Sequence, residues 1–173
     1  AECDILFVPG GSHAGKFHPV VTMSRNLLPF ELKELFRYGY SATTLKLLLL
    51  RWSQSRSYRR SDGVIFLSNA ARKSVLRVTG KLEAECPIIP HGLNLRFRLE
   101  PKNQSPISSY SAERPYRLIY VSIIDQYKHQ WHVVEIVSAL RREGFPLTLD
   151  LVGPAYPPAL RRLNATISRC DPE

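Results

Sequence analysis

RLIYVSIIDQYKHQWHVVEIVSALRREGFPLTLDLV, residues 117–152, contains two short β-rich runs separated by one helical run. The runs 117–121 and 147–152 are apolar and rich in β-branched or aromatic residues, which is typical of strands. Between them, apolar residues recur at helical spacing over 130–143, and Gly144 provides a stop signal. Strand, helix and strand in this order predict a parallel sheet with a crossover helix, so the fold class is α/β.

The same alternation is visible on both sides of this stretch. Ser68 is a suitable N-cap for a helix that ends at Gly80. A helical region with a break near Gly39 covers residues 31–60, and a final helix is expected over 158–169. We predict further strands over residues 5–8, 20–23, 63–67 and 87–90.

One segment interrupts the alternation and marks a domain boundary. Residues 98–115 are rich in Ser and Pro and show no hydrophobic period. We therefore divide the chain into residues 1–97, a linker over 98–115, and residues 116–173. Neither end carries a targeting pattern or a natural start, so we expect the chain to be internal to a longer protein.

Composition narrows the function classes. The chain has 173 residues, is 44% hydrophobic, and has no apolar run near the roughly 18 residues that a membrane span needs. Its three widely spaced cysteines form neither a disulfide framework nor a zinc pattern, which favours a reducing cytoplasm. The net charge of +9 suits an anionic partner, although a solvated helix face explains it equally well.

A glycine-rich loop follows the first predicted strand. Gly10, Gly15 and Lys16 have the spacing of a phosphate-binding P-loop. However, Phe17 stands where that motif needs Ser or Thr, and the strand after Pro19 leaves no room for its helix. We expect instead a loop at the carboxyl edge of a sheet, where Gly10 and Gly11 line a ligand crevice.

Other catalytic patterns are weak. His129, His132 and Glu135 stand three residues apart on one helix, but the spacing matches no known zinc helix and no cysteine is near. We interpret them as surface groups and predict no metal site. The chain also lacks a Gly-x-Ser-x-Gly nucleophile elbow, so hydrolase chemistry has no anchor.

Taken together, the ordered segments resemble the retaining family 4 glycosyltransferases of the GT-B fold. Five segments carry the resemblance, and their order and spacing matter more than any one of them. They are VVTMSRNLLPFE (20–31), SDGVIFLS (61–68), IIPHG (88–92), LIYVS (118–122) with the following YKH (127–129), and LDLVG (149–153).

This resemblance implies two Rossmann-like domains, both only partly present, with the reaction in the cleft between them. The first would hold a saccharide or lipid-linked acceptor of the cell-surface polysaccharide or lipopolysaccharide type. The second would hold a UDP- or GDP-sugar, with no cofactor and no obligatory metal. Lys128 matches the family lysine that neutralises the donor diphosphate, a role that stabilises the leaving nucleotide. The residues expected to complete the site are Ser122 beside the diphosphate and Gly10, Gly11, Asn26, His91, Gly92 and Gly153 along the cleft.

Three departures from the family pattern bear on this site. Ser122-Ile123-Ile124 replaces the stretch where the family often has an arginine, and Arg25-Asn26 replaces an amino-domain histidine. The family's two-glutamate motif would lie beyond Glu173. Diphosphate binding would therefore depend on Lys128 and on backbone N–H groups.

Two partner hypotheses concern the basic segment 45–60. Its helical pattern and arginines are consistent with peripheral docking on an anionic inner leaflet by a cytoplasmic enzyme. The competing interpretation is a nucleotide- or nucleic-acid-binding module without chemistry, which the aromatic residues Trp52 and Tyr58 among the arginines would suit. The glycosyltransferase interpretation expects no nucleic acid partner.

Overall fold

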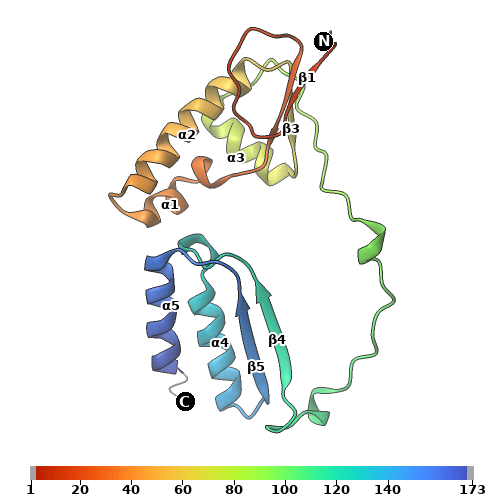
Figure 1. Ribbon diagram of the computed structural model, residues 1–173, viewed down its shortest axis with the longest axis vertical. Coiled ribbons are helices and arrows are strands. Elements are labelled where there is room, and N and C mark those ends of the chain that lie inside the picture. Colours follow the sequence, from red (N-terminus) through yellow and green to blue (C-terminus); the bar gives the residue numbers. More distant parts are fainter. Residues whose placement is uncertain (1–2, 171–173) are drawn as a thin grey trace. The chain divides into compact units, whose positions relative to one another are not determined.

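The computed structural model describes residues 3–170 and has a mixed α/β architecture (Figure 1). The chain divides into two compact units, residues 1–99 and residues 100–173, which we call the amino unit and the carboxyl unit. Their division falls within the segment 98–115, where the sequence is rich in Ser and Pro. That segment contains a single turn of 3₁₀ helix, Ile107–Ser109.

The amino unit is built on a three-stranded parallel sheet. Its strands are β1 (Leu6–Val8), β2 (Val20–Ser24) and β3 (Gly63–Phe66), in the order β1-β2-β3. The strand expected over 87–90 is only partly formed, because it meets β3 through the isolated bridge between Phe66 and Ile88. Prolines at both ends of that segment lack the N–H groups that a longer ladder needs.

The long helical region of the amino unit is interrupted where the sequence predicts. Helix α1 (Leu32–Leu35) is a single turn, and Gly39 then adopts a φ of 60° that favours glycine. Helix α2 (Ala42–Arg59) begins after Ser41, whose side chain accepts a hydrogen bond from the Thr44 N–H. Helix α3 (Asn69–Thr79) has the predicted cap at Ser68 and ends at Gly80. The core beneath these helices contains Phe30, Tyr58, Val64, Phe66, Ala71, Val75 and Leu82.

The carboxyl unit has the predicted order of strand, helix, strand and helix. These elements are β4 (Tyr116–Val121), α4 (Gln130–Arg142), β5 (Leu147–Val152) and α5 (Pro157–Cys170). The strands are parallel and in full register, and both helices cover one face of the sheet (Figure 1). Alternate residues of each strand are exposed on the other face.

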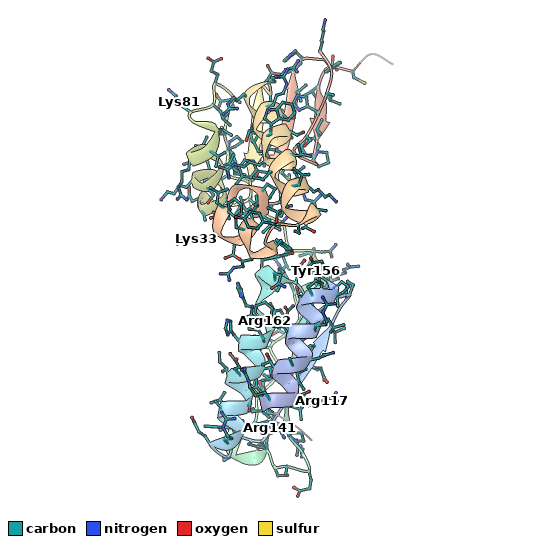
Figure 2. The ribbon with its side chains drawn as sticks, turned by 90° about the vertical axis from the view of Figure 1, so that its left-hand side faces the viewer. Lys33, Lys81, Arg117, Arg141, Tyr156 and Arg162 are labelled. Carbon is teal, nitrogen blue, oxygen red and sulfur yellow. The ribbon has the colours of Figure 1, made fainter. Side chains whose placement is uncertain are left out.

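The buried face of α4 differs in part from the predicted one. The sequence pattern places Val133, Ile136, Val137 and Leu140 in the core, but Ile136 is 60% exposed. Trp131 and Val134 are buried instead, together with Val137. The apolar residues of α4 cover a wide arc, so their spacing alone does not choose the side that faces the sheet. The large Trp131 ring is almost fully buried, and the Arg162 guanidinium of α5 lies 3.9 Å from its centroid. Figure 2 labels Arg162 on this helix.

Two simple expectations can be compared with the structure directly. All three cysteines have free thiols. Among the helices of residues 3–170, none combines the length and the apolar character that a bilayer crossing requires.

Candidate functional site

The carboxyl edge of the sheet in the carboxyl unit brings two predicted site residues together. Ser122 follows β4 and Gly153 follows β5, and the Ser122 N–H donates to the Val152 carbonyl at 2.9 Å. Because the two strands are parallel, the loops that follow them leave the sheet at the same edge. This is the edge at which ligands bind in open α/β sheets.

Gly153 is required at its position by the backbone of Ser122. Its φ is 150°, and a Cβ built on it would lie 2.2 Å from the Ser122 carbonyl oxygen. No side chain fits there unless the backbone moves. The sequence placed Gly153 in the site, and its close approach to the neighbouring loop is the physical reason for a glycine.

The loop between β4 and α4 is fixed to the loop after β5. The Ile124 N–H donates to the Pro154 carbonyl at 2.8 Å, and the Ile124 carbonyl accepts from the Tyr156 N–H at 2.9 Å. The Ile124 side chain is buried in the core of the carboxyl unit. The loop that carries Lys128 is therefore attached, at Ile124, to the segment between β5 and α5.

Lys128 ends a short 3₁₀ turn, Gln126–Lys128, just before α4. The Asp125 carboxylate caps this turn by accepting from the Gln126 N–H at 2.6 Å. The Tyr120 hydroxyl, from β4, donates to the Lys128 carbonyl at 3.3 Å. Strand β4 thus holds the Lys128 backbone, while its amino group lies 5.0 Å from the centroid of the Tyr127 ring.

The N-terminus of α4 comes directly after Lys128. His129, the residue before the helix, has the left-handed conformation (φ 56°, ψ 33°) and turns the chain sharply into Gln130. The buried Gln130 side chain donates to the Ile123 carbonyl at 2.8 Å and so holds the helix against the loop. A helix N-terminus carries partial positive charge and N–H groups that suit an anion. Lys128 adds a full positive charge beside it.

Two further groups shape the electrostatics of this loop. Burial raises the pKa of the Tyr127 hydroxyl, and the nearby Asp125 carboxylate adds to the increase. Tyr127 therefore stays neutral at physiological pH and can donate a hydrogen bond. The arrangement suits charge neutralisation of a phosphate group, with Asp125 as the one acidic side chain between residues 122 and 129.

In the amino unit, the glycine-rich loop follows β1 as predicted and runs into β2 rather than into a helix. Gly11 is buried with a φ of 77°, and a Cβ on it would lie 2.8 Å from the Tyr58 hydroxyl. Gly10 is exposed, with no heavy atom within 4 Å of a built Cβ. Gly11 therefore packs against α2, whereas Gly10 is open to a ligand.

A polar cluster beneath this loop was not found from the sequence. Its members combine deep burial with the absence of a hydrogen-bond partner within the described residues, and they are His13 Nδ1, Ser24 Oγ, Gln54 Oε1, Ser55 Oγ and the Tyr58 hydroxyl. Burial also raises the pKa of Tyr58, an effect that the neighbouring Ser24 hydroxyl partly offsets. The one available signal was the run of polar residues at the end of α2, which reads equally well as a solvated helix face.

The other predicted cleft residues of the amino unit are exposed, and Asn26 also has a local role. Asn26 is exposed, and its side-chain oxygen accepts from the Leu28 N–H at 3.0 Å, which stabilises the turn before α1. His91 and Gly92 are exposed in a coil. No heavy atom of the protein lies within 4 Å of a Cβ built on Gly92.

Of the three helix-spaced groups, His132 and Glu135 pair with each other on α4, whereas the ring of His129, the residue before the helix, stacks on that of His132 with centroids 5.8 Å apart. His132 Nδ1 lies 3.0 Å from one Glu135 oxygen, and Arg169 of α5 donates to the other at 2.6 Å. The hydrogen bond from His132 is the main cause that lowers the pKa of Glu135. Across residues 3–170, His, Cys, Asp and Glu side chains form no group of three or more that could hold a metal ion.

A comparison with protein-family models found no match for this chain, and no curated protein sequence matches it significantly.

Proposed function

We propose that this chain contributes to a retaining glycosyltransferase with two Rossmann-like domains of GT-B type. The enzyme would transfer a hexose from a UDP- or GDP-sugar to a saccharide or a lipid-linked acceptor of a cell-surface glycan. The carboxyl unit would bind the donor diphosphate, and the amino unit would contribute to the acceptor side. Such an enzyme would act in the cytoplasm or on the inner face of its membrane.

One observation supports this proposal more than any other. At the carboxyl edge of β4 and β5, Lys128 and the N-terminus of α4 follow each other after a loop that Ile124 joins to the segment after β5. Gly153 and the small Ser122 let the loops after β4 and β5 lie close together, and they leave little side-chain bulk at this edge. A diphosphate needs such a combination of one cation, several N–H donors and little steric bulk.

The chemistry follows from charge. When the bond between the anomeric carbon and the diphosphate oxygen breaks, negative charge grows on the departing nucleotide. Lys128 and the N–H groups at the start of α4 would interact more strongly with that charge than with the intact donor. Groups that bind the transition state more tightly than the ground state accelerate the reaction.

Titration calorimetry with UDP, GDP and inorganic diphosphate tests this proposal on the chain as it stands. A charge-assisted hydrogen bond contributes roughly 1.5–3 kcal/mol, so we expect Lys128→Ala to weaken nucleotide binding about tenfold or more. Ser122→Ala should have a smaller effect. Lys102→Ala is the matched control, because Lys102 is an exposed lysine in the Ser- and Pro-rich segment.

Two results would contradict the proposal. Equal affinity of the wild type and Lys128→Ala for all three ligands would show that Lys128 does not form a diphosphate site. Stronger binding to single-stranded oligonucleotides than to UDP or GDP, with a steep decrease in added salt, would favour the nucleic-acid-binding module instead.

A further inference from the structure

Helix α2 packs on the amino unit through a mainly polar face. Its buried residues are Thr44, Leu47, Gln54, Ser55, Ser57 and Tyr58. Ser57 is tied to the glycine-rich loop, because its hydroxyl accepts from the His13 N–H at 3.0 Å. The Tyr58 ring stacks on Phe30 with centroids 5.8 Å apart. These contacts fix which side of α2 faces the protein.

The opposite face of α2 exposes large apolar side chains. Leu45, Leu48, Leu49 and Trp52 follow the spacing i, i+3, i+4 and i+7, which places them in one stripe along the helix. Leu49 is 59% exposed and Trp52 is 67% exposed. Tyr40, fully exposed, borders the same shallow hollow as Leu45 and Leu48. We call these five residues the apolar stripe.

The charged residues of helix α2 have one sign. Helix α2 contains four basic residues and no acidic residue. Exposed Arg56 lies one turn beyond Trp52 on the same side, and exposed Lys46 flanks Leu45 and Leu49. Other arginines of the segment bind backbone carbonyls within the unit: Arg51 donates to Pro29 and Arg59 to Thr79. Lys46 and Arg56 are therefore the two basic residues of α2 that lie exposed beside the apolar stripe.

We infer that the apolar stripe is a docking surface for a lipid bilayer with anionic headgroups. Helix α2 would lie flat in the interface, with the leucines and Trp52 in the boundary between headgroups and acyl chains. Lys46 and Arg56 would lie among the lipid phosphates. A contiguous exposed apolar surface rimmed by cations is typical of interfacial helices. This inference does not depend on the proposed glycosyltransferase activity.

The observations favour a membrane over a second copy of this chain. In a symmetric dimer, the same patch of each copy faces the other. The basic residues of one α2 would then lie near those of its partner, without any acidic residue on the helix to neutralise them. An anionic lipid surface instead matches both the apolar and the cationic parts of the stripe.

Flotation with vesicles and tryptophan quenching test the inference together. The full chain is mixed with vesicles of neutral lipid, or of neutral lipid with 30 mol% anionic lipid, roughly the range in which basic residues add to apolar binding. We expect binding to the anionic vesicles, and Leu48→Ser combined with Leu49→Ser should reduce it about tenfold. Brominated lipid should quench the fluorescence of Trp52, and Trp52→Phe should remove that quenching.

The controls separate insertion from other causes. Ile136→Ser is the matched control, because Ile136 lies on α4 with almost the same exposure as Leu49 and should leave binding unchanged. Circular dichroism checks that each variant is folded. The inference is wrong if brominated lipid leaves the fluorescence unchanged. It is also wrong if the leucine substitutions leave vesicle binding intact, because binding would then be purely electrostatic, or if they abolish a dimer that light scattering detects in the wild type.

Discussion

Helices α2 and α4 are the longest helix of the amino unit and the crossover helix of the carboxyl unit, and they bury different mixtures of side chains. Helix α4 turns Trp131 and Val134 inward, whereas α2 turns Gln54 and Ser57 inward and leaves Trp52 in solvent. The difference lies in what each helix meets. Helix α4 meets the apolar side chains of β5 and α5, while the end of α2 meets the backbone of the glycine-rich loop. Buried backbone polar groups need partners, so a polar helix face fits there.

The two tryptophans provide the sharpest contrast between these helices. Trp131 is 2% exposed and stacks under Arg162, so Trp131→Ala should lower the free energy of unfolding by roughly 3–5 kcal/mol. Trp52→Ala should change it by no more than about 0.5 kcal/mol, because its ring is already in water. Urea denaturation followed by circular dichroism measures both. Similar losses in the two variants would contradict the assignment of α2's outer face as exposed.

Glycine substitutions in the two units give the next largest effect. Gly153→Ala places a Cβ against the Ser122 carbonyl, so the backbone must move, at a cost of about 2–4 kcal/mol. Gly92→Ala in the amino unit meets nothing and should be close to neutral. Thermal unfolding of the two variants measures the difference. A tolerated Gly153→Ala would show that the loops after β4 and β5 are less tightly joined than their hydrogen bonds indicate.

Tyr58→Phe tests the polar underside of α2. The Tyr58 hydroxyl is buried beside the Ser24 hydroxyl, but within the described residues it makes no hydrogen bond of good geometry. Removing it deletes an unpaired polar group while keeping the ring that stacks on Phe30, so the free energy of unfolding should stay the same or rise. Denaturant titration beside the wild type measures the change. A loss above about 2 kcal/mol would instead indicate that this hydroxyl binds Ser24 or an internal water.

The smallest expected effect is a pH dependence from His13. Burial is the main cause that lowers the pKa of His13 below 6.5, and the positive charge of Arg60 adds to it. The unfolded chain therefore binds the proton more readily than the folded one. The contribution of His13 is fully favourable above about pH 6.5 and is lost as the pH falls toward its folded pKa. His13→Gln should flatten the stability profile between pH 7 and 5, and NMR titration should give His13 a pKa below 6.5.

The strands and helix ends could be predicted because local chemistry determines them. Ser68 caps α3 and Gly39 interrupts the helical region because few other residues suit those backbone positions. The orientation of α2 could not be predicted in this way. Its apolar spacing resembles a core face, and only the position of the glycine-rich loop shows that the other side is buried. The prediction that Ile136 is buried was wrong for a related reason. The apolar residues of α4 cover too wide an arc to show which side faces the sheet.

The candidate site shows the same division. Ser122 and Gly153 were assigned to the site by the family resemblance, and they lie together because the loops after parallel strands leave the sheet at one edge. The polar cluster under Gly11 could not be predicted from the sequence. Its members come from the glycine-rich loop, β2 and α2, which are far apart in sequence. Gly92 was assigned to the cleft by the resemblance, and in the amino unit it lies exposed in a coil.

The attachment of Ile124 has a mechanical consequence. Ile124 divides the segment after β4 into two short spans. A ligand that restrains Lys128 should therefore also restrain the start of α5, through the hydrogen bond from the Tyr156 N–H to the Ile124 carbonyl. Ligand binding at the proposed diphosphate site should therefore slow deuterium exchange at Tyr156, although that residue belongs to a different loop. The exchange protection of the loops after β4 and β5 would then change together on ligand binding, as in one cooperative unit.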